Sequence, residues 1–406
     1  MTVLEAVEPK LRFNEFDGSW EEKRLGEVCN KIQDGNYSFD YPKSHEFLSK
    51  GVPFLTSKAL GEDGEIINSK IDYISQEKHS SLKKAQIKPA DILFTNRGAN
   101  VGAIGEVGDF IEEGNIGPQL TLLRANREII LPKFLKYCMK TPVLNKQVRS
   151  QDSGSAMNFF GIKATSKFKL CIPGLIEQQK IADFLSAVDK KISLLGEKRA
   201  LLEQYKKGVM QKLFKQEMRF KDDDGSDFPS WKLDAVGSYL EEFKERVPVD
   251  TELPVLTSSR TGLYLQERKV INDGEYGVLP KGYFTYRHMS DDLVFKFNLN
   301  RDWDKAAISK EYPVFRAVGM NSYFLELALN EGDDFTRFAI QQKVGGTRTR
   351  LYFKNLVKLK LPIPCLKEQN KIADFLQKID EKIGLVKKQI ELTQTFKKGL
   401  LQQMFV

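Results

Sequence analysis

Arginine, asparagine and small hydroxyl side chains gather in a few short turns of the sequence, and these residue types could read nucleic acid bases. An arginine can pair with guanine and an asparagine with adenine through two hydrogen bonds, while a neighbouring glycine lets the backbone approach a phosphate. The alternative for each is an exposed polar residue that binds nothing. The candidate contacts in the N-terminal half are Thr56, Ser57, Lys58, Asn96, Arg97 and Asn100. Those in the C-terminal half are Ser258, Ser259, Arg260, Tyr286, Arg287, His288, Thr347, Arg348 and Arg350.

No motif of a catalytic site accompanies these turns. The sequence contains no GxxxxGK[ST] phosphate loop, no GxSxG turn, no HExxH helix and no Asn-Pro-Pro-aromatic tetrapeptide of an amino-methyltransferase. The glycines between Gly98 and Gly108 lack dinucleotide-binding spacing, and a strand–turn–strand is the favoured interpretation. Four widely spaced cysteines without a CxxC pair, and only 3 histidines, argue against a metal site. We therefore predict no catalytic residue, no metal and no cofactor in this chain.

The composition is that of a folded and mildly basic protein. Its 406 residues suggest two or three domains, and a 41% hydrophobic share is enough to build buried cores. The net charge of +8 favours a nucleic-acid partner only weakly, because 55 acidic residues dilute 63 basic ones. The sequence has no apolar run of about 18 residues and no secretory signal, and its spaced cysteines are typical of reduced thiols. We therefore expect a cytoplasmic protein.

An internal repeat is the feature that must position these turns. Residues 172–214 align with residues 363–405 at an offset of 191 without a gap, and 21 of the 43 positions are identical. Each copy follows a Pro-containing turn and has no interior proline, which predicts one long helix. Weaker similarities occur in the segments that lead into each half, at Arg12, Phe13, Gly18 and Trp20 and again at Arg219, Phe220, Gly225 and Trp231.

Apolar residues in both copies fall at heptad a and d positions, which predicts a narrow apolar seam between two helices. Lys206 and Lys397 interrupt this seam at equivalent a positions, where a polar residue lowers stability and can specify register. The alternative is an amphipathic helix buried in an ordinary domain. The predicted seam residues are Ile181, Leu185, Val188, Ile192, Leu195, Leu202, Val209, Ile372, Leu376, Ile379, Ile383, Val386, Ile390 and Leu400.

The segments between the helices share a plan but diverge heavily in residues. Short strand-like stretches such as Val52–Leu55 and Asp91–Phe94 are separated by Gly- and Asp-rich turns, and no βαβ rhythm is visible. We therefore predict an α/β (α+β) fold. Its two globular domains are expected over residues 1–171 and 216–362, and its two long helices over residues 172–215 and 363–406.

Two diverged domains separated by near-identical long helices resemble the specificity subunit of a type I restriction–modification system. The similarity covers almost the whole chain and is most specific in the helix openings IPGLIEQQKIADFLSAVDKKI and IPCLKEQNKIADFLQKIDEKI. The leading segments RFNEFDGSWEEKRLGEV and RFKDDDGSDFPSWKL also resemble family segments, as does the stretch SGSAMNFFGIK. Its counterpart in the second half, VGGTRTRLYFK, differs from that family segment in sequence.

That resemblance implies two target-recognition domains on two antiparallel coiled-coil helices related by a pseudo-two-fold repeat. Each domain would read one half of a gapped double-stranded DNA site, and the helices would set the spacing. The implied partners are two methyltransferase subunits, which would use S-adenosylmethionine on adenine, and restriction subunits, which would use ATP and Mg. These partners would carry the catalysis. The alternative functions are a coiled-coil scaffold that binds protein but not DNA, and an enzyme with a fused modification domain.

Overall fold

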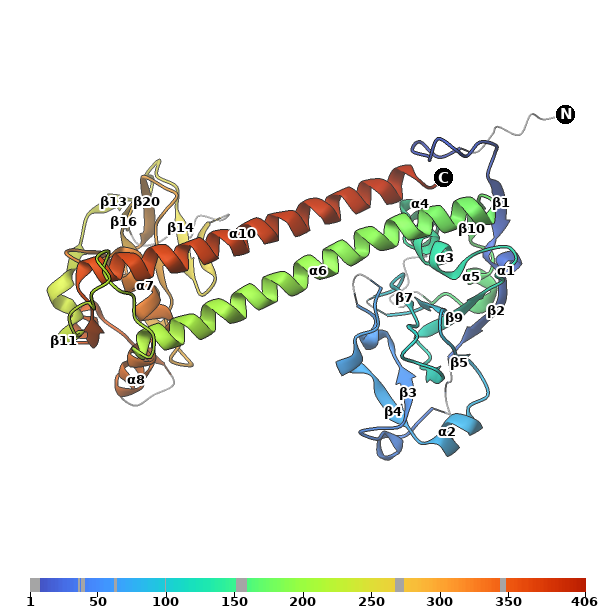
Figure 1. Cartoon of the computed structure of the whole chain (residues 1–406), viewed down its shortest axis with the longest axis horizontal. Coiled ribbons are helices and arrows are strands. Elements are labelled where there is room, and N and C mark those ends of the chain that lie inside the picture. Colours follow the sequence, from blue (N-terminus) through green and yellow to red (C-terminus); the bar gives the residue numbers. More distant parts are fainter. Residues whose placement is uncertain are drawn as a thin grey trace. The chain divides into compact units, whose positions relative to one another are not determined.

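The computed structural model describes residues 8–35, 37, 41–61, 64–98, 100–150, 159–266, 274–343 and 348–406. The chain forms two compact units: unit 1 is Met1–Glu197 with Lys387–Val406, and unit 2 is Lys198–Val386. Helices α6 (Leu175–Phe214) and α10 (Leu366–Gln403) occupy the two repeated segments (Figure 1). Each long helix is divided between the units, so the compact units do not coincide with the four predicted segments.

Unit 1 contains two four-stranded sheets. The antiparallel first sheet has the order β2 (Cys29–Asp34), β9 (Leu120–Ala125), β6 (Ile92–Thr95) and β7 (Ile104–Glu106). The second has the order β4 (Asp72–Ile74), β3 (Val52–Leu55), β8 (Gly114–Ile116) and β5 (Gln86–Ile87), with β3 and β8 parallel. Strand β6 is buried on both faces, because successive side chains alternate: Phe94 joins the core under the helices, and Leu93 joins the core shared with the second sheet.

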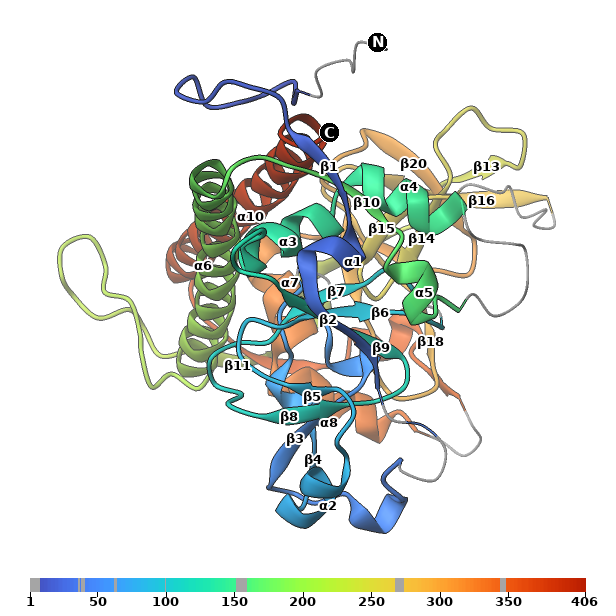
Figure 2. The ribbon, with the colours of Figure 1, turned by 90° about the vertical axis from the view of Figure 1, so that its right-hand side faces the viewer.

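The helices that pack with the first sheet are α1 (Leu25–Val28), α3 (Pro132–Met139), α4 (Pro142–Ser150) and α5 (Ile162–Thr165). Helix α2 (Gln76–Ser81) lies with the second sheet, where His79 bonds Asn115 of β8. Helix α3, which starts at a proline as helix N-termini favour, lies beside the N-terminal part of α6 (Figure 2). Phe134 of α3, Leu185 of α6 and Leu400 of α10 belong to one buried core. Both long helices therefore contribute to the core of unit 1.

Unit 2 is built from sheets of two to four strands. The largest has the order β12 (Leu240–Phe243), β21 (Val314–Ala317), β17 (Phe284–Tyr286) and β19 (Phe297–Leu299). A second has the order β13 (Arg246–Pro248), β16 (Glu275–Pro280) and β20 (Lys305–Ser309). Two two-stranded sheets are the hairpin of β14 (Leu256–Ser259) with β15 (Gly262–Leu265) and the pair of β18 (Met289–Ser290) with β22 (Thr349–Arg350). Helices α7 (Ser322–Glu331), α8 (Asp333–Gln341) and α9 (Phe353–Leu356) pack with the long helices in one core. The mixed α/β prediction is thus confirmed.

The chain enters the long helix through the same kind of strand pair in each unit. In unit 1, β1 (Glu21–Arg24) pairs antiparallel with β10 (Lys169–Ile172), directly before α6. In unit 2, β11 (Lys232–Ala235) pairs in the same way with β23 (Lys360–Ile363), directly before α10. The last strand has the same alternation of exposed and buried residues in both units. The leading segment of each half is therefore tied to the start of that half's long helix.

The predicted seam residues lie on the buried side of the long helices. Ten of the 14 are buried, and Leu195, Leu202, Ile383 and Ile390 are half-buried. The stripe does not face only a second helix. In unit 1 Ile181 lies in the core with Phe134, and in unit 2 Leu376 lies in the core with Phe324, so the seam also packs on the globular part of each unit. Among the described residues, no helix is long and apolar enough to cross a membrane.

Candidate nucleic-acid interface

Three of the predicted contacts in unit 1 meet at the turn Gly117–Gln119, which connects β8 to β9. Arg97 donates from Nε and Nη2 to the carbonyl oxygen of Pro118 at 3.1 and 2.7 Å. The Ser57 hydroxyl donates to Gln119 Oε1 at 3.3 Å, and the backbone N–H of Asn96 donates to the Gln119 carbonyl oxygen at 2.9 Å. Segments that are far apart in the sequence thus converge on one turn.

Arg97 is held in one orientation between aromatic rings. Its guanidinium carbon lies 4.9 Å from the ring centroid of Phe159 and 5.4 Å from that of Tyr37. Both rings are exposed, at 52% for Phe159 and 40% for Tyr37. Arg97 has no ion-pair partner in the part of the chain that the structure describes, and its Nη1 donates no hydrogen bond to those residues. A fixed guanidinium with unused donors is suited to a planar acceptor such as a guanine edge.

A buried polar network supports this arginine. Asp34 Oδ1 accepts from the Thr121 hydroxyl at 2.6 Å and from Asn96 Nδ2 at 3.3 Å, and Asp34 Oδ2 accepts from the Tyr37 hydroxyl at 3.1 Å. Burial and the Asp34 carboxylate raise the pKa of Tyr37, which keeps its hydroxyl protonated as a donor. Strand β2 thereby holds the ring that Arg97 rests against.

The structure corrects the expected role of two unit 1 residues. Asn96 is fully buried and bonded to Asp34 and Thr121, so its amide holds strand ends together and is not presented to a base. Thr56 is also buried, and its methyl group faces Gly117. Asn100 is exposed, and Lys58 is exposed while paired with Asp72 at 2.7 Å.

The predicted contacts of unit 2 gather where β14, β18 and β22 end. Arg260 binds Asp292 through both terminal nitrogens, at 2.6 and 2.8 Å, and Ser290 donates to the same carboxylate at 2.9 Å. The Arg260 guanidinium lowers the pKa of Asp292 to about 2. Arg348 donates from Nε to Asp291 at 2.9 Å. Two adjacent aspartates therefore hold two of the predicted arginines.

The other two arginines of unit 2 that were predicted as contacts are not paired in this way. Arg350 lies opposite Met289 in the β18–β22 pair, and Arg287 lies two residues before β18. Both are exposed, and neither has an ion-pair partner among the described residues. The half-buried Ser259 receives a bond from Asn298 at its carbonyl oxygen. Thr347, also predicted as a contact, lies outside the described residues.

Three predicted contacts of unit 2 are buried inside it, which corrects their expected role. The hydroxyl of Tyr286 donates to the carbonyl oxygen of Leu351 at 3.1 Å, within a cluster of aromatic rings. His288 stacks on Tyr352, and burial lowers its pKa, so it is neutral at pH 7. Ser258 accepts from Asn298 Nδ2 at 2.8 Å. These side chains shape the strands that carry the exposed arginines.

The sequence interpretation missed a second set of residues, which joins each unit to its helix. Arg12 binds the buried Glu177 of α6 through Nε and Nη2, both at 2.8 Å. Arg219 binds the fully buried Glu368 of α10 in the same way, at 3.0 and 2.8 Å, and Trp231 Nε1 donates to that carboxylate at 3.0 Å. In each half, the arginine of the leading segment therefore forms an ion pair with the glutamate that both copies of the repeat contain.

The glutamine after each of these glutamates makes an equivalent joint. Gln178 Oε1 accepts from the backbone N–H of Leu131, just before α3, at 2.9 Å. Gln369 Oε1 accepts from the backbone N–H of Asn321, just before α7, at 2.9 Å. The signal for both residues was present in the sequence, because Glu-Gln is identical in the two copies. Gly18 and Gly225 have φ of +83° and +85°, a left-handed conformation that glycine favours, in the two leading segments.

Comparison with known proteins identifies the family to which this chain belongs. Residues 18–204 and 309–394, more than half of the chain, match the family of the type I restriction modification DNA specificity domain. The chain belongs to this family. The specificity subunit is 24% identical to a putative type I restriction enzyme MjaX specificity subunit of Methanocaldococcus jannaschii, over 97% of this chain and 94% of the relative. It is 23% identical to the type I restriction enzyme MjaVIII specificity subunit of the same organism, over 99% and 96%.

Solved structures support the fold of this specificity subunit. The S subunit of a type I restriction–modification system from M. genitalium has a TM-score of 0.59 at 13% identity, covering 98% of this chain and 99% of that one. A chain from a study of complex assembly in the type I R-M system has a TM-score of 0.57 at 16% identity, covering 94% and 96%. The predicted DNA-specificity role in a type I system, as a subunit that is not itself catalytic, is confirmed.

Proposed function

We propose that this specificity subunit reads an interrupted double-stranded DNA site, one half with each unit. The observation that carries the proposal is that each unit presents its own exposed or half-buried arginine after a corresponding strand: Arg97 after β6 and Arg287 after β17. The recognition domains span residues 1–171 and 216–362, and the spacer helices span 172–215 and 363–406. The proposed contacts are Ser57, Lys58, Arg97, Asn100, Ser259, Arg260, Arg287, Arg348 and Arg350, with Thr347 kept from the sequence.

The two long helices are proposed to pair antiparallel, related by a pseudo-two-fold axis, and to set the distance between the half-sites. Within unit 1, Asp189 near the middle of α6 lies 2.6 Å from Lys397 near the end of α10. Within unit 2, Lys206 near the end of α6 lies 2.6 Å from Asp380 near the middle of α10. This crossed pairing supports an antiparallel arrangement. The 40 residues of α6 make a rod of about 60 Å, which corresponds to about 18 base pairs of B-DNA.

The partners are proposed to be two methyltransferase subunits, joined by restriction subunits in a full nuclease. Each unit carries an exposed apolar pair on a long helix: Leu201 and Tyr205 in unit 2, and Leu392 and Phe396 in unit 1, all more than half exposed. The pairs are equivalent at the repeat offset of 191. Two copies of one apolar patch suit two copies of one partner. S-adenosylmethionine, ATP and Mg would be bound by those partners.

The proposed function is tested by co-expressing this chain with its adenine methyltransferase and sequencing the methylated genome. Methylated adenines are expected in one gapped motif. Replacing residues 20–171 with the same segment of another specificity subunit is expected to change only one half of that motif. An assembled complex that methylates without a motif would contradict the proposal and favour a protein-binding scaffold.

Charge on the apolar patches should prevent assembly. We expect Leu201→Glu combined with Leu392→Glu to weaken methyltransferase binding at least 100-fold, because two glutamates would be buried against an apolar partner surface. Each single variant is expected to leave one methyltransferase bound per chain. Mass measurement of the purified complex gives the stoichiometry. The control is Lys207→Glu, which is exposed on the opposite face of α6, and equal binding by the double variant and the control would refute the patch assignment.

A further inference from the structure

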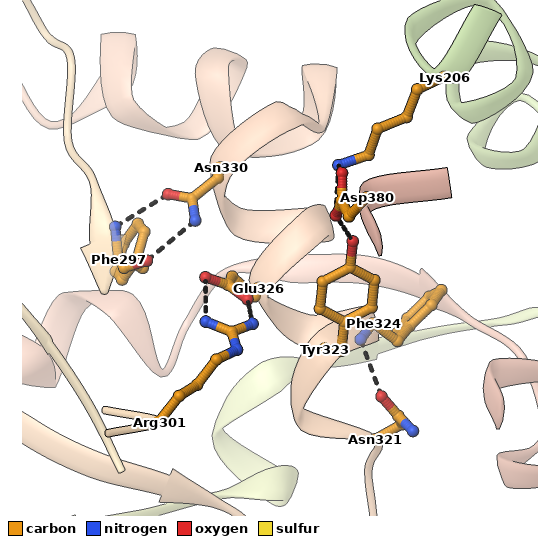
Figure 3. A network of polar contacts seen from close by, with 9 residues as sticks. All are labelled: Lys206, Phe297, Arg301, Asn321, Tyr323, Phe324, Glu326, Asn330 and Asp380. Carbon is orange, nitrogen blue, oxygen red and sulfur yellow. Dashed lines mark hydrogen bonds and ion pairs between the residues drawn. The ribbon is translucent and has the colours of Figure 1, made fainter. Parts of the chain in front are cut away.

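A lysine, an aspartate and a tyrosine meet in unit 2 where the apolar seam is interrupted (Figure 3). Lys206 Nζ of α6 lies 2.6 Å from Asp380 Oδ1 of α10, and it donates to Asp380 Oδ2 at 2.8 Å. The hydroxyl of Tyr323, in the first turn of α7, donates to the same carboxylate. Asp380 of α10 therefore contacts both the other long helix, α6, and helix α7 of the globular part of the unit.

Unit 1 contains the same triad. Lys397 Nζ of α10 lies 2.6 Å from Asp189 Oδ1 of α6. The hydroxyl of Tyr137, on α3, donates to Asp189 Oδ2 at 2.8 Å. Lys397 is only 8% exposed, which is rare for a lysine, and its ammonium is compensated by this carboxylate.

The aspartates and lysines of the two triads occupy equivalent positions in the repeat, but the tyrosines do not. The aspartates and the lysines correspond at the offset of 191. Tyr137 is the sixth residue of α3, whereas Tyr323 is the second residue of α7. Different positions on two diverged helices therefore supply a hydroxyl to the same carboxylate. Burial raises the pKa of both tyrosines, so that each hydroxyl remains a donor.

A charged group inside an apolar seam contributes to specificity more than to stability. Removing two charges from water offsets most of their attraction, and well-packed apolar residues in the same place are often as stable. A single polar position in such a seam does exclude other registers, because a shift leaves the group without its partner.

The sequence shows what a shift of α10 by one heptad would do. The new neighbours of Lys206 and Asp189 would be Lys387 and Met404 in one direction, and Ala373 and Ile390 in the other. One shift places two ammonium groups together, and both leave the carboxylate against an apolar side chain. At most other seam positions a heptad shift exchanges one apolar residue for another; Arg199 and Thr393 are the other polar residues in the heptad frame. The triads are the part of the seam in which a shift separates two opposite charges.

We propose that the two Tyr–Asp–Lys triads are positioning residues that hold α6 and α10 in one axial register and so fix the number of base pairs between the two half-sites. The DNA consequence rests on the proposed function. The register itself does not, and it can be measured without DNA or a partner subunit.

The first experiment measures register in the isolated full chain. Nitroxide labels at Gln211 and Gln377, both exposed and both in unit 2, report the axial position of α10 against α6, with exposed Cys365 replaced by serine. The wild-type background is expected to give one distance. The variant Lys206→Leu, Asp380→Leu, Asp189→Leu, Lys397→Leu is expected to melt no lower and to show a second distance, since a heptad shift moves the helix by about 10 Å.

The second experiment uses the assembled methyltransferase. The fourfold leucine variant is expected to methylate the same half-site bases, with at least a tenfold rise at sites whose spacer differs by about three base pairs, the length of one heptad along B-DNA. The control is Gln179→Ala with Asp183→Ala, which removes an exposed hydrogen bond within α6 outside the seam and should change neither readout.

Each outcome decides the proposal. One label distance and one spacer in the leucine variant would overturn it, because the apolar cores alone would then fix the register. If that variant does not fold, Asp189→Asn with Asp380→Asn carries the same expectation. The conservative variant Lys206→Arg with Lys397→Arg, made in the wild-type chain, keeps both ion pairs and should keep the single spacer. A wild-type complex that methylates no motif would refute the proposed function, while the label distances would still decide the register.

Discussion

Replacing Arg97 with alanine is expected to abolish discrimination at one half of the DNA site and to leave the other half unchanged. The guanidinium is fixed by Pro118, Phe159 and Tyr37 before any DNA arrives, so little conformational entropy is lost on binding. A bidentate contact of arginine with guanine discriminates by about 1–3 kcal/mol. We therefore expect a loss of roughly five- to 150-fold for DNA with the correct unit 1 half-site, measured by anisotropy with the assembled complex.

Two further variants separate base reading from general attraction. Arg97→Lys keeps the charge but not the planar pair of donors, so it should retain non-specific binding and lose most of the discrimination. Lys58→Ala removes an exposed cation in the same unit and should weaken binding to all sequences alike, with a smaller salt dependence. If Arg97→Ala binds every half-site variant as the unmodified complex does, Arg97 does not read DNA.

The helices were the predictable part of this fold. Their signal is repeated in one chain and depends on the spacing of apolar residues, which burial enforces directly. Ile181 and Leu376, placed on the seam from spacing alone, are almost fully buried. Spacing could not tell that these residues would also meet α3 and α7, because a heptad pattern records only that a stripe is apolar and not what covers it.

The candidate site was predictable in part. The segment FTNRG was identified by residue type, which does not distinguish Arg97 at the surface from Asn96 beneath it. Both faces of β6 are buried, so the usual alternation of polar and apolar residues gives no warning there. The pairing of Arg260 with Asp292 spans 32 residues and joins the turn after β14 to the turn after β18. No local pattern contains that information.

Glu368 illustrates the opposite failure. This residue is a glutamate in both copies of the repeat. A glutamate in the first turn of a helix is ordinarily exposed, and its negative charge interacts favourably with the helix dipole. Only the fold shows that it is fully buried and bound by Arg219 and Trp231. An identical polar residue in two diverged copies is therefore a signal for a buried joint as well as for a ligand contact.

Arg219→Ala is accordingly expected to be the most destabilising single change outside the apolar cores. It leaves the Glu368 carboxylate buried with Trp231 as its remaining described donor, and breaking such a pair costs about 3–5 kcal/mol. Arg219 itself is partly exposed, so Glu368→Gln should cost less, because the arginine can regain water. Lys221→Ala is the matched control, since its ion pair with Asp227 is exposed and worth about 0–1 kcal/mol. Urea unfolding followed by hydrogen exchange in β11, β23 and the first turns of α10 measures the loss. A shift for Arg219→Ala no larger than that for Lys221→Ala would show that the leading segment does not hold the helix.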